Sequence, residues 1–306
     1  MDNDFDVIIL GGGPAGLTAG IYLSRAKIKT LILNEGSIGG QVVLTHEIAN
    51  FPGVEKISGF MLARTMKTQA QQFGCKIKSN VNITDIDLQN KTIEINNKDV
   101  FTSKAIIIAS GGTARNLNIK GENKFKGRGV SYCATCDGDF YQDMDIVVVG
   151  GGNSALEEAV SLTKYAKSVT IVHQFDHFQA FKHAVDEAKS NEKISFILES
   201  ELIEIVGDKK VEKVIIENQK THEISELKTD GVFVFVGYKP NSDKFNNKVA
   251  INKWGEIITD NNRATNVKGV FAAGDVIEKQ VRQITTAVGD ATIAAMSCIN
   301  YLQSVI

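Results

Sequence analysis

Several kinds of residue are scarce in this sequence, and each scarcity excludes a class of protein. Only three of its 306 residues are proline and no low-complexity tract occurs, which argues against disordered arms. Four cysteines are too few for a disulfide scaffold, which a chain of this length does not need. No apolar run approaches the ~20 residues of a transmembrane helix, and the acidic start Met1–Phe5 is unlike a signal peptide. We therefore expect a cytoplasmic protein that makes no membrane contact.

The charge balance gives the molecule as a whole no attraction to polyanions. With a net charge of −2, we expect no nucleic-acid partner. Arginine is unevenly placed, since none occurs between Arg128 and Arg263. The hydrophobic fraction of 43% and the charged fraction of 23% are those of a globular protein, and the length suffices for two domains.

The chain repeats one pattern, and its two copies begin at Asp6 and Asp145, 139 residues apart. Each copy has an apolar strand, a triple glycine, a helix and a second strand, which together form the parallel βαβ unit. We therefore predict an α/β fold of two Rossmann-like three-layer domains. The matching segments are 6–10 and 145–149 for the first strands, 17–24 and 156–163 for the helices, and 30–33 and 169–172 for the second strands.

The remaining segments indicate that the second domain is inserted into the first. Residues 77–87 and 92–95 alternate like antiparallel strands, and residues 269–275 supply a strand that the first copy lacks. A long helix over about residues 285–302 closes the chain. The expected boundaries are 1–115 plus 245–306 for the first domain and 116–244 for the inserted one, with crossings near 115–118 and 238–241.

The first triple glycine has the form of a dinucleotide-binding turn. Gly11, Gly13 and Gly16 follow a strand and begin a helix, which is the context that this pattern requires. Gly11 makes the tight turn, Gly13 lets a pyrophosphate approach the backbone, and Gly16 allows close packing of the helix. The pyrophosphate would meet the free N–H groups at the helix N-terminus. Glu35, 19 residues beyond Gly16, ends the second strand, where a carboxylate accepts hydrogen bonds from an adenosine ribose.

Two cysteines, Cys133 and Cys136, lie two residues apart and are followed by Asp137. The nucleophile in thiol–disulfide exchange is a thiolate, which a helix start stabilises, and a second sulfur nearby resolves the mixed disulfide. The alternative, half of a zinc site, would need two further ligands. No second CxxC occurs, and the three histidines in residues 173–183 are not spaced as a metal cage. We therefore predict a redox dithiol and no metal site.

These features resemble the low-molecular-weight thioredoxin reductases over essentially the whole chain. The resemblance implies that the first domain binds FAD and that the inserted domain is like the pyridine-nucleotide module of that family. The likeness rests on Gly11–Gly16, Gly39–Gln41, Asn50–Gly53, Tyr132–Phe140, Gly269–Asp275 and Arg282–Ala287. Together with the glycine turn and Glu35, the expected FAD contacts are Gly11, Gly13, Pro14, Ala15, Gly16, Glu35, Gly40, Gln41, Asn50, Gly274, Asp275, Arg282, Gln283 and Ala287.

The resemblance also implies roles for the dithiol. Cys133 would be the interchange thiol that attacks thioredoxin, and Cys136 would be the thiol beside the flavin. Asp137 would be the general acid that supplies a proton to the departing thiolate. The resemblance further implies a homodimer, and a rotation between domains that exposes the dithiol alternately to the flavin and to thioredoxin.

The second glycine turn keeps its backbone pattern over Gly150–Ala155, but the residues that would bind NADPH are absent. Arginine binds a 2′-phosphate with two parallel hydrogen bonds, and NADPH-dependent members of the family carry an HRRxxxR pattern after the second strand. In this chain, Gln174, Phe175 and Gln179 stand in the three arginine positions.

This difference makes the chain resemble the ferredoxin-dependent flavin thioredoxin reductases, a branch in which reduced ferredoxin supplies the electrons. Three alternatives stay open: NADH recognised through Asp176, weak binding of NADPH, and a small-molecule dithiol oxidase that uses oxygen. Ferredoxins are acidic, so a docking face should be rich in lysine. The candidate clusters are Lys124, Lys126 and Arg128, or Lys164, Lys167 and Lys182.

Overall fold

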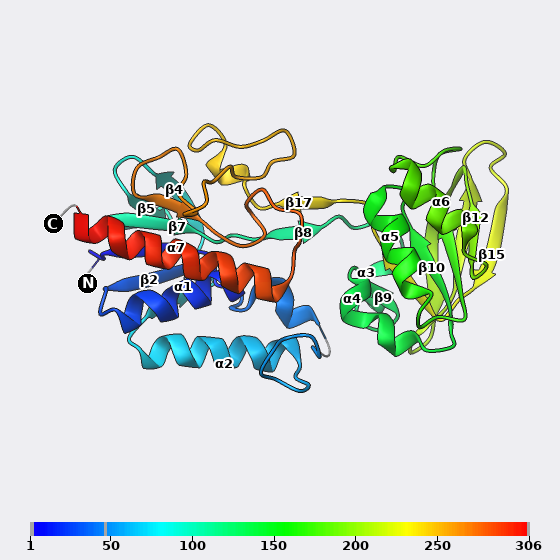
Figure 1. Ribbon diagram of the computed structural model, residues 1–306, viewed down its shortest axis with the longest axis horizontal. Helices are drawn as coiled ribbons and strands as arrows, with labels where there is room; N and C mark the ends of the chain where they lie inside the picture. The colour runs from blue at the N-terminus through cyan, green and yellow to red at the C-terminus, as the bar shows by residue number, and fades with distance from the viewer. Residues whose placement is uncertain (1–2, 46–47, 305–306) are drawn as a thin grey trace. The chain divides into compact units, whose positions relative to one another are not determined.

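The computed structural model describes residues 3–45 and 48–304, which form two compact units (Figure 1). The first unit comprises Met1–Thr113 and Lys239–Ile306, and the second comprises Ala114–Tyr238. These boundaries differ from those expected after residues 115 and 244. The segment after Tyr238 stays with the first unit because the Asn241 N–H donates to the Gly111 carbonyl at 2.9 Å and the Ser242 hydroxyl to the Gly255 carbonyl at 2.5 Å.

A five-stranded parallel sheet forms the centre of the first unit, in the order β18-β7-β1-β2-β3. Its central strands are runs of Ile, Leu, Val and Ala, and a strand covered on both faces requires such a run. The late strand β18 lies beside β7 and completes the sheet. The strands are β1 (Val7–Leu10), β2 (Thr30–Asn34), β3 (Lys76–Ser79), β7 (Ala105–Ile108) and β18 (Val270–Ala272).

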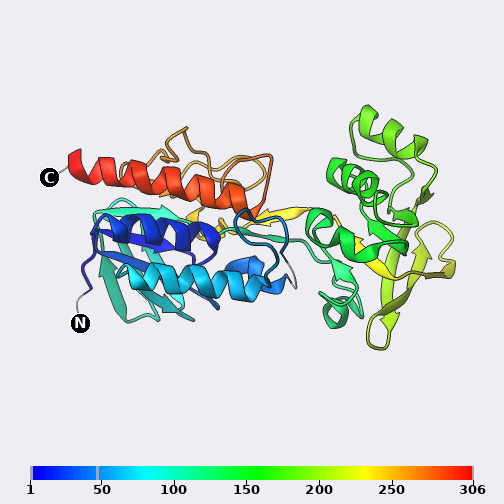
Figure 2. The same cartoon turned by 60° about the horizontal axis from the view of Figure 1, so that its bottom comes forward.

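Three helices cover one face of this sheet, and α1 lies between α7 and α2 (Figures 1 and 2). Helix α1 begins at Pro14, where a missing N–H costs no helical hydrogen bond. Buried alanines on α7 let the helices approach closely. The helices are α1 (Pro14–Arg25), α2 (Gly59–Gln72) and α7 (Ile284–Ser304), with 3₁₀ helices η1 (Gly40–Leu44) and η3 (Asp243–Phe245).

An antiparallel ribbon covers the opposite face of the sheet and shares a second apolar core with it. It consists of β4 (Ile83–Asp87), β5 (Thr92–Ile95) and β6 (Asp99–Thr102). The prediction of one antiparallel segment over residues 77–87 is therefore wrong for its first part. Residues 77–79 belong to β3, which pairs in parallel with β2, and Asn80 turns the chain before β4 with φ 54°. Asparagine tolerates this left-handed backbone better than most residues.

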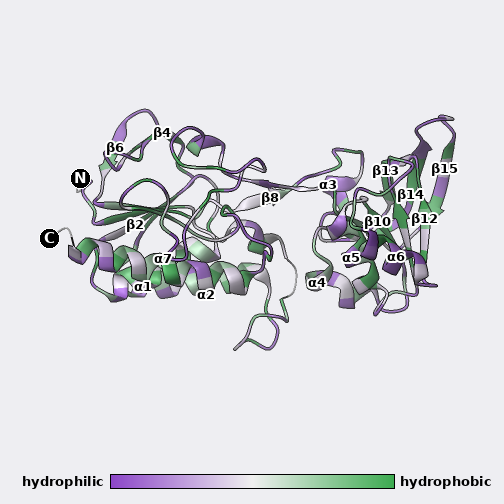
Figure 3. Ribbon diagram, turned by 45° about the horizontal axis from the view of Figure 1, so that its top comes forward, coloured by the Kyte–Doolittle hydropathy of each residue, from purple (hydrophilic) through white to green (hydrophobic). Residues whose placement is uncertain are grey.

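The second unit repeats the three layers of the first. Its parallel sheet has the order β12-β11-β10-β16-β9, with two helices on one face and an antiparallel ribbon on the other. Figure 3 shows hydrophobic residues concentrated along its strands. The sheet strands are β9 (Val130–Ser131), β10 (Asp145–Val149), β11 (Ser168–Val172), β12 (Ile194–Ile197) and β16 (Gly231–Val234). The ribbon is β13 (Ser200–Gly207), β14 (Val211–Asn218) and β15 (Ile224–Lys228), and the helices are α5 (Asn153–Leu162) and α6 (Lys182–Ser190), with the short α3 (Glu122–Phe125), α4 (Ala134–Asp137) and η2 (Gly138–Tyr141).

The chain passes between the units twice, through strands β8 (Gly112–Ala114) and β17 (Tyr238–Pro240), which pair with each other. The N–H of Arg115 donates to the Gly237 carbonyl at 2.9 Å and extends this pairing. No helix in residues 3–45 and 48–304 is long and apolar enough to cross a bilayer.

Candidate active site

The first glycine turn is shaped by positions that accept no side chain. Gly11 has φ 116°, and a Cβ there would collide with the Ala109 carbonyl oxygen. A Cβ on Gly16 would collide with the Gly11 carbonyl in the same way, so Gly16 lets α1 start directly against the turn. Gly13 faces Gly40, where a Cβ would lie 3.2 Å from the Gly13 Cα. The backbone is therefore bare on both sides at the N-terminus of α1, and free N–H groups at a helix N-terminus suit an anion such as a pyrophosphate.

An elongated cleft in the first unit begins at this turn and runs to the start of α7. It contains nine of the fourteen residues predicted to contact FAD: Gly11, Gly13, Pro14, Ala15, Gly40, Gln41, Asp275, Gln283 and Ala287. The other residues that line it are Gly12, Asn34, Val42, Ala109, Ser110, Gly111, Gly112, Asn241, Ala273 and Ile284. Bare glycine backbone, a helix N-terminus and amide and carboxyl side chains in one cleft fit a dinucleotide such as FAD.

Asn34 is a residue of this cleft that the sequence analysis missed. Its Oδ1 accepts a hydrogen bond from the Gly12 N–H at 2.8 Å, and its Nδ2 donates to the Gly36 and Ser37 carbonyls at 2.6 and 3.0 Å. Asn34 thus fixes the glycine turn against the loop that follows β2. Its position as the last residue of β2, directly before Glu35, is the sequence signal that could have found it.

Glu35 does not line the cleft, and its carboxylate has partners elsewhere in the first unit. Its Oε1 forms an ion pair with the Lys244 Nζ at 2.5 Å and accepts the Ile83 N–H at 3.2 Å. Both the Glu35 and the Lys244 side chains are partly exposed, so water screens this pair. The role of Glu35 in holding an adenosine ribose stays a prediction.

The far end of the cleft brings together segments that are distant in sequence. The Asn50 Nδ2 donates to the Gln283 Oε1 at 3.4 Å, which joins the loop before α2 to the start of α7. The guanidinium of Arg282 forms an ion pair with Glu256. Gly274 has φ 79°, and a Cβ there would lie 2.8 Å from the Ala15 Cβ, so this glycine lets the turn after β18 pass α1. Four of the predicted contacts therefore lie around the cleft but do not line it: Gly16, Asn50, Gly274 and Arg282.

Cys133 and Cys136 form a disulfide in the second unit. Cys133 is the N-cap of α4, and Cys136 and Asp137 lie on that short helix. The Ser131 hydroxyl donates to the Asp137 Oδ2 at 2.6 Å and accepts the Cys133 N–H at 3.1 Å. Ser131 therefore connects the first cysteine to the acid, a link that the sequence analysis did not foresee. The structure thus brings the three predicted catalytic residues together.

Glu122 anchors the segment that leads to the dithiol. This carboxylate is buried, and it accepts the N–H groups of Leu117 and Asn118 at 2.8 and 2.7 Å. The Tyr132 hydroxyl donates to the same carboxylate at 2.7 Å. Burial and the Glu122 carboxylate raise the pKa of Tyr132 well above its usual range, so the phenol stays a donor. These bonds place residues 117 and 118 within the second unit.

The second glycine turn keeps the shape of the first. Gly150 has φ 138°, and a Cβ there would collide with the Phe235 carbonyl oxygen. The ring of His173 packs on Gly151, and burial lowers the pKa of His173. The Gln179 N–H donates to the Gly151 carbonyl at 2.8 Å, so the segment after β11 lies directly against the turn.

The segment His173–Gln179 contains no lysine or arginine. Phe175 and Phe178 pack against the His173 ring, with centroid distances of 5.4 and 5.7 Å. Asp176 is exposed, and its Oδ1 lies 2.6 Å from the His177 Nδ1. The Lys182 Nζ is paired with Asp186 at 2.5 Å. Aromatic rings thus pack around His173 in this part of the second unit.

The two lysine clusters considered for docking differ in their contacts. The Lys124 Nζ donates to the Gly207 carbonyl at 3.0 Å, and the Lys126 Nζ lies 4.8 Å from the centre of the Tyr132 ring, next to Cys133. In the other cluster, Lys167 is paired with Asp145 at 3.3 Å, and Lys182 is paired with Asp186. The first cluster therefore keeps more of its positive charge.

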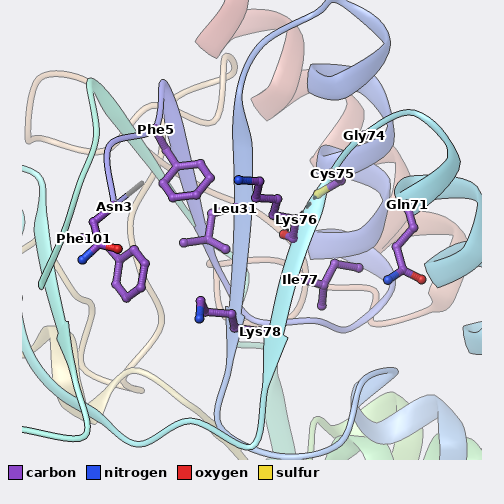
Figure 4. A pocket seen from close by; sticks show the side chains of 10 residues that line it. All are labelled: Asn3, Phe5, Leu31, Gln71, Gly74, Cys75, Lys76, Ile77, Lys78 and Phe101. Atoms are coloured by element: carbon purple, nitrogen blue, oxygen red, sulfur yellow. Dashed lines mark hydrogen bonds between the residues drawn. The ribbon is translucent and has the colours of Figure 1, made fainter. Parts of the chain in front are cut away.

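A second pocket, of about 580 Å³, opens at the edge strand β3 of the first unit (Figure 4). Phe5 and Phe101 lie on one side of the strand, and the ammonium groups of Lys76 and Lys78 lie over their rings at 5.6 Å. It contains none of the predicted site residues. Lysine on an edge strand discourages pairing with other strands, which explains these residues without a ligand. Among the described residues, no cluster of histidine, cysteine, aspartate and glutamate could hold a metal ion.

Comparison with known proteins places the chain among enzymes of disulfide chemistry. The family model for pyridine nucleotide-disulphide oxidoreductases matches residues 5–291. A Clostridium pasteurianum protein described as a 34.2 kDa protein in a rubredoxin operon is 48% identical over 302 residues, which cover 98% of each chain. The thioredoxin reductase of Peptoclostridium acidaminophilum is 44% identical over 312 residues, with 99% of each chain covered.

The likeness extends to solved structures. The thioredoxin reductase from Streptococcus pyogenes MGAS5005 has a TM-score of 0.93 to this chain at 40% identity, with 99% of this chain and 100% of that one covered. Each of these three matches covers at least 98% of this chain. The chain therefore belongs to the low-molecular-weight thioredoxin reductase family, whose members are FAD-containing disulfide oxidoreductases.

Proposed function

We propose that the protein reduces thioredoxin through the Cys133–Cys136 disulfide, with electrons that FAD receives from reduced ferredoxin and not from NADPH. The observation that carries the choice of donor is the segment His173–Gln179, which contains no lysine or arginine beside the second glycine turn. The similarity of the whole chain to thioredoxin reductases supports the choice of substrate.

The cysteine pair carries out the last step, the transfer of two electrons to thioredoxin. Reduction converts the disulfide into two thiols, and the Cys133 thiolate then attacks the disulfide of thioredoxin to form a mixed disulfide. Cys136 resolves that bond, so that thioredoxin leaves as a dithiol and the Cys133–Cys136 disulfide forms again. Asp137, oriented by Ser131, supplies the proton that the departing thiolate of thioredoxin needs.

FAD supplies an acceptor that takes up electrons singly and passes them on as a pair. The residues of the first unit that hold it are, in this proposal, those of the glycine turn, Gly40 and Gln41 facing that turn, and Asp275, Gln283 and Ala287 at the far end. Four further residues stabilise the segments that form the cleft without lining it: Gly16, Gly274, Asn50 and Arg282. Glu35 would accept hydrogen bonds from the adenosine ribose once its ion pair with Lys244 has broken.

The energetics disfavour NADPH as the donor. Each hydrogen bond between a charged side chain and a phosphate contributes about 1.5–3 kcal/mol. Gln174, Phe175 and Gln179 offer none of these charged bonds, and the exposed carboxylate of Asp176 would repel a phosphate. The combined loss amounts to several orders of magnitude in affinity. NADH, which carries no 2′-phosphate, escapes this penalty and is the second candidate, with Asp176 as the acceptor for its ribose.

An anaerobic turnover assay tests the proposal. We expect rapid reduction of thioredoxin when ferredoxin, kept reduced by an external source, is the only donor, and little or none with NADPH at micromolar concentration. If NADH supports turnover at a rate comparable to that expected with ferredoxin, the electron donor would be NADH and the ferredoxin assignment would be wrong. Oxygen consumption driven by a small dithiol, without reduction of thioredoxin, would instead identify a dithiol oxidase.

The proposal also includes a homodimer, a location in the cytoplasm and an FAD-binding domain interrupted by the module that carries the dithiol. The same resemblance supports each of these points. Analytical ultracentrifugation of the yellow protein should give a mass near twice the 33.3 kDa of the chain.

A further inference from the structure

A buried cluster of charges lies beside the cleft, at the junction of α7 with the turn after β18. Asp290, in the second turn of α7, is 6% exposed. Its Oδ1 accepts hydrogen bonds from the Arg263 Nε and Nη2 at 3.1 and 2.9 Å. Its Oδ2 accepts one from the Lys279 Nζ at 2.6 Å. The Lys279 side chain is only 10% exposed, so solvent screens this ion pair little.

Lys279 is shared between two carboxylates. Besides its hydrogen bond to Asp290, its ammonium lies 3.8 Å from the Asp275 Oδ1, one turn earlier in the chain. Asp275 lines the cleft and Asp290 does not. The ammonium therefore connects a residue of the cleft to helix α7, and neither the family resemblance nor the dithiol chemistry gives it a role.

Lys279 is the cation that lowers the pKa of Asp275 most. Arg282 is the other cation near Asp275, but its guanidinium is paired with Glu256. Arg263 is directed to the Oδ1 of Asp290. Without Lys279, Asp275 would keep Arg282, which acts on it more weakly, and would still lie near the Asp290 carboxylate. Like charges in a buried site disfavour ionisation of the more weakly compensated group.

The electrostatics of Asp275 agree with this geometry. Burial raises the pKa of Asp275, Lys279 and Arg282 lower it, and Asp290 raises it. The carboxylate at the cleft thus depends on a balance in which Lys279 and Asp290 act in opposite directions. An ionised carboxylate is the stronger acceptor for a ligand hydroxyl group, because its hydrogen bonds are charge-assisted.

We propose that Lys279 is a positioning residue that keeps Asp275 ionised and directed into the FAD cleft, and that Asp290 limits its effect by competing for the same ammonium. The inference rests on the proposed contact between Asp275 and FAD, and it is independent of the electron donor. It predicts that FAD is released below a certain pH. Loss of the Lys279 charge should raise that pH, and loss of the Asp290 charge should lower it.

The test is the release of FAD from diluted holoenzyme, followed by flavin fluorescence over a range of pH. In Lys279→Met, release should be faster by roughly ten- to hundred-fold, because a charge-supported hydrogen bond is lost. The acceleration should begin at a higher pH than in the wild type, since Asp275 protonates sooner. Lys279→Arg keeps the charge and should restore retention. Lys98→Met, an exposed substitution of the same kind in the same unit, should behave as wild type.

Asp290→Asn separates this role from simple support of the fold. Our account predicts that its FAD release begins at a lower pH than in the wild type, because Lys279 then serves Asp275 alone. If Lys279→Met and Asp290→Asn both release FAD faster, and to the same extent at every pH, the charged cluster only stabilises the fold. That result would overturn the inference. Unchanged release in Lys279→Met would overturn it as well. If Asp275→Asn releases FAD no faster than wild type at any pH, the proposed contact of Asp275 fails instead.

Discussion

At the scale of single residues, two kinds of cysteine coexist in the chain. Cys133 and Cys136 form the disulfide at the start of α4, whereas Cys75 and Cys298 are free and buried. Burial raises the pKa of the Cys75 thiol to about 11 and that of the Cys298 thiol to about 12. Since the thiolate is the reactive form, these two cysteines are inert packing residues at neutral pH.

This difference predicts a selective alkylation. After mild reduction under native conditions, iodoacetamide at about pH 8 should modify Cys133 or Cys136 and leave Cys75 and Cys298 unmodified, because their pKa values lie well above that pH. Peptide mass spectrometry measures the sites. Modification of Cys75 at a rate similar to Cys133 would contradict the assignment, and unfolding in guanidinium should expose all four thiols as a control.

A single substitution tests the dithiol itself. Cys136→Ser should abolish reduction of thioredoxin, because no resolving sulfur remains, while the yellow colour of bound FAD persists. Cys298→Ala, a change to a free cysteine outside the site, should keep most of the activity. Visible spectra and turnover are measured on the same samples. Turnover by Cys136→Ser would mean that electrons bypass the disulfide.

Among the structural elements, the segment from β8 to α4 is held by one buried acid. Glu122 accepts three hydrogen bonds, two from Leu117 and Asn118 after the crossing and one from Tyr132 beside the dithiol. The position of the dithiol relative to its own sheet therefore depends on a side chain eleven residues before Cys133.

Loss of this carboxylate should loosen the segment. Glu122→Ala should lower the free energy of unfolding of the second unit by about 2–4 kcal/mol, since three partly buried donors lose their acceptor and a buried side chain is removed. Hydrogen exchange should become faster at the amides of Leu117 and Asn118. Glu201→Ala, an exposed change in the same unit, serves as the control. Unchanged exchange at both amides would show that Glu122 does not anchor this segment.

The segment after β11 offers a test by gain of function. Gln174→Arg, Phe175→Arg and Gln179→Arg, made together, restore the positive charge that a 2′-phosphate requires, on a glycine turn that keeps its shape. The triple variant should reduce thioredoxin with NADPH at least about ten-fold faster than wild type. A matched triple change to Gln174→Glu, Phe175→Leu and Gln179→Glu should gain nothing. Failure of the arginine variant would show that more than these contacts has been lost.

The elements also show what the sequence could and could not predict. The strands beside each glycine turn were predictable because a parallel strand covered on both faces must be apolar along its length. The parallel pairing of residues 77–79, at the start of the first segment predicted to be antiparallel, was not, since β3 has the polar sequence of an edge strand and alternates like an antiparallel one. Local chemistry identified the dithiol, whereas Asn34 and Ser131 act through neighbours that only the folded chain brings close. Glu35 satisfied the spacing rule, but its pairing with Lys244, 209 residues away, was not visible in the sequence.

At the scale of the whole molecule, one unit holds the flavin cleft and the other holds the dithiol, and both repeat the same three-layer plan. The second unit keeps the shape of the glycine turn, and residues 173–179 beside it include no lysine or arginine. The account therefore assigns the entry of electrons to the first unit and their exit to the second.

This division predicts how many electrons each chain takes up. Full anaerobic reduction should take about four one-electron equivalents per chain, two for the disulfide and two for FAD. In Cys136→Ser the count should fall to about two. Titration with reduced ferredoxin, followed at the flavin absorbance, measures both values. A count of two in the wild type would show that the disulfide does not communicate with FAD.

The central claim concerns the donor, and one measurement addresses it directly: the rate at which the flavin absorbance of the anaerobic protein is bleached in a stopped-flow instrument. The account predicts rapid bleaching by reduced ferredoxin, slowed by added salt because the contact is electrostatic, and no comparable bleaching by NADPH at micromolar concentration. Rapid bleaching by micromolar NADPH, with none by reduced ferredoxin, would contradict it.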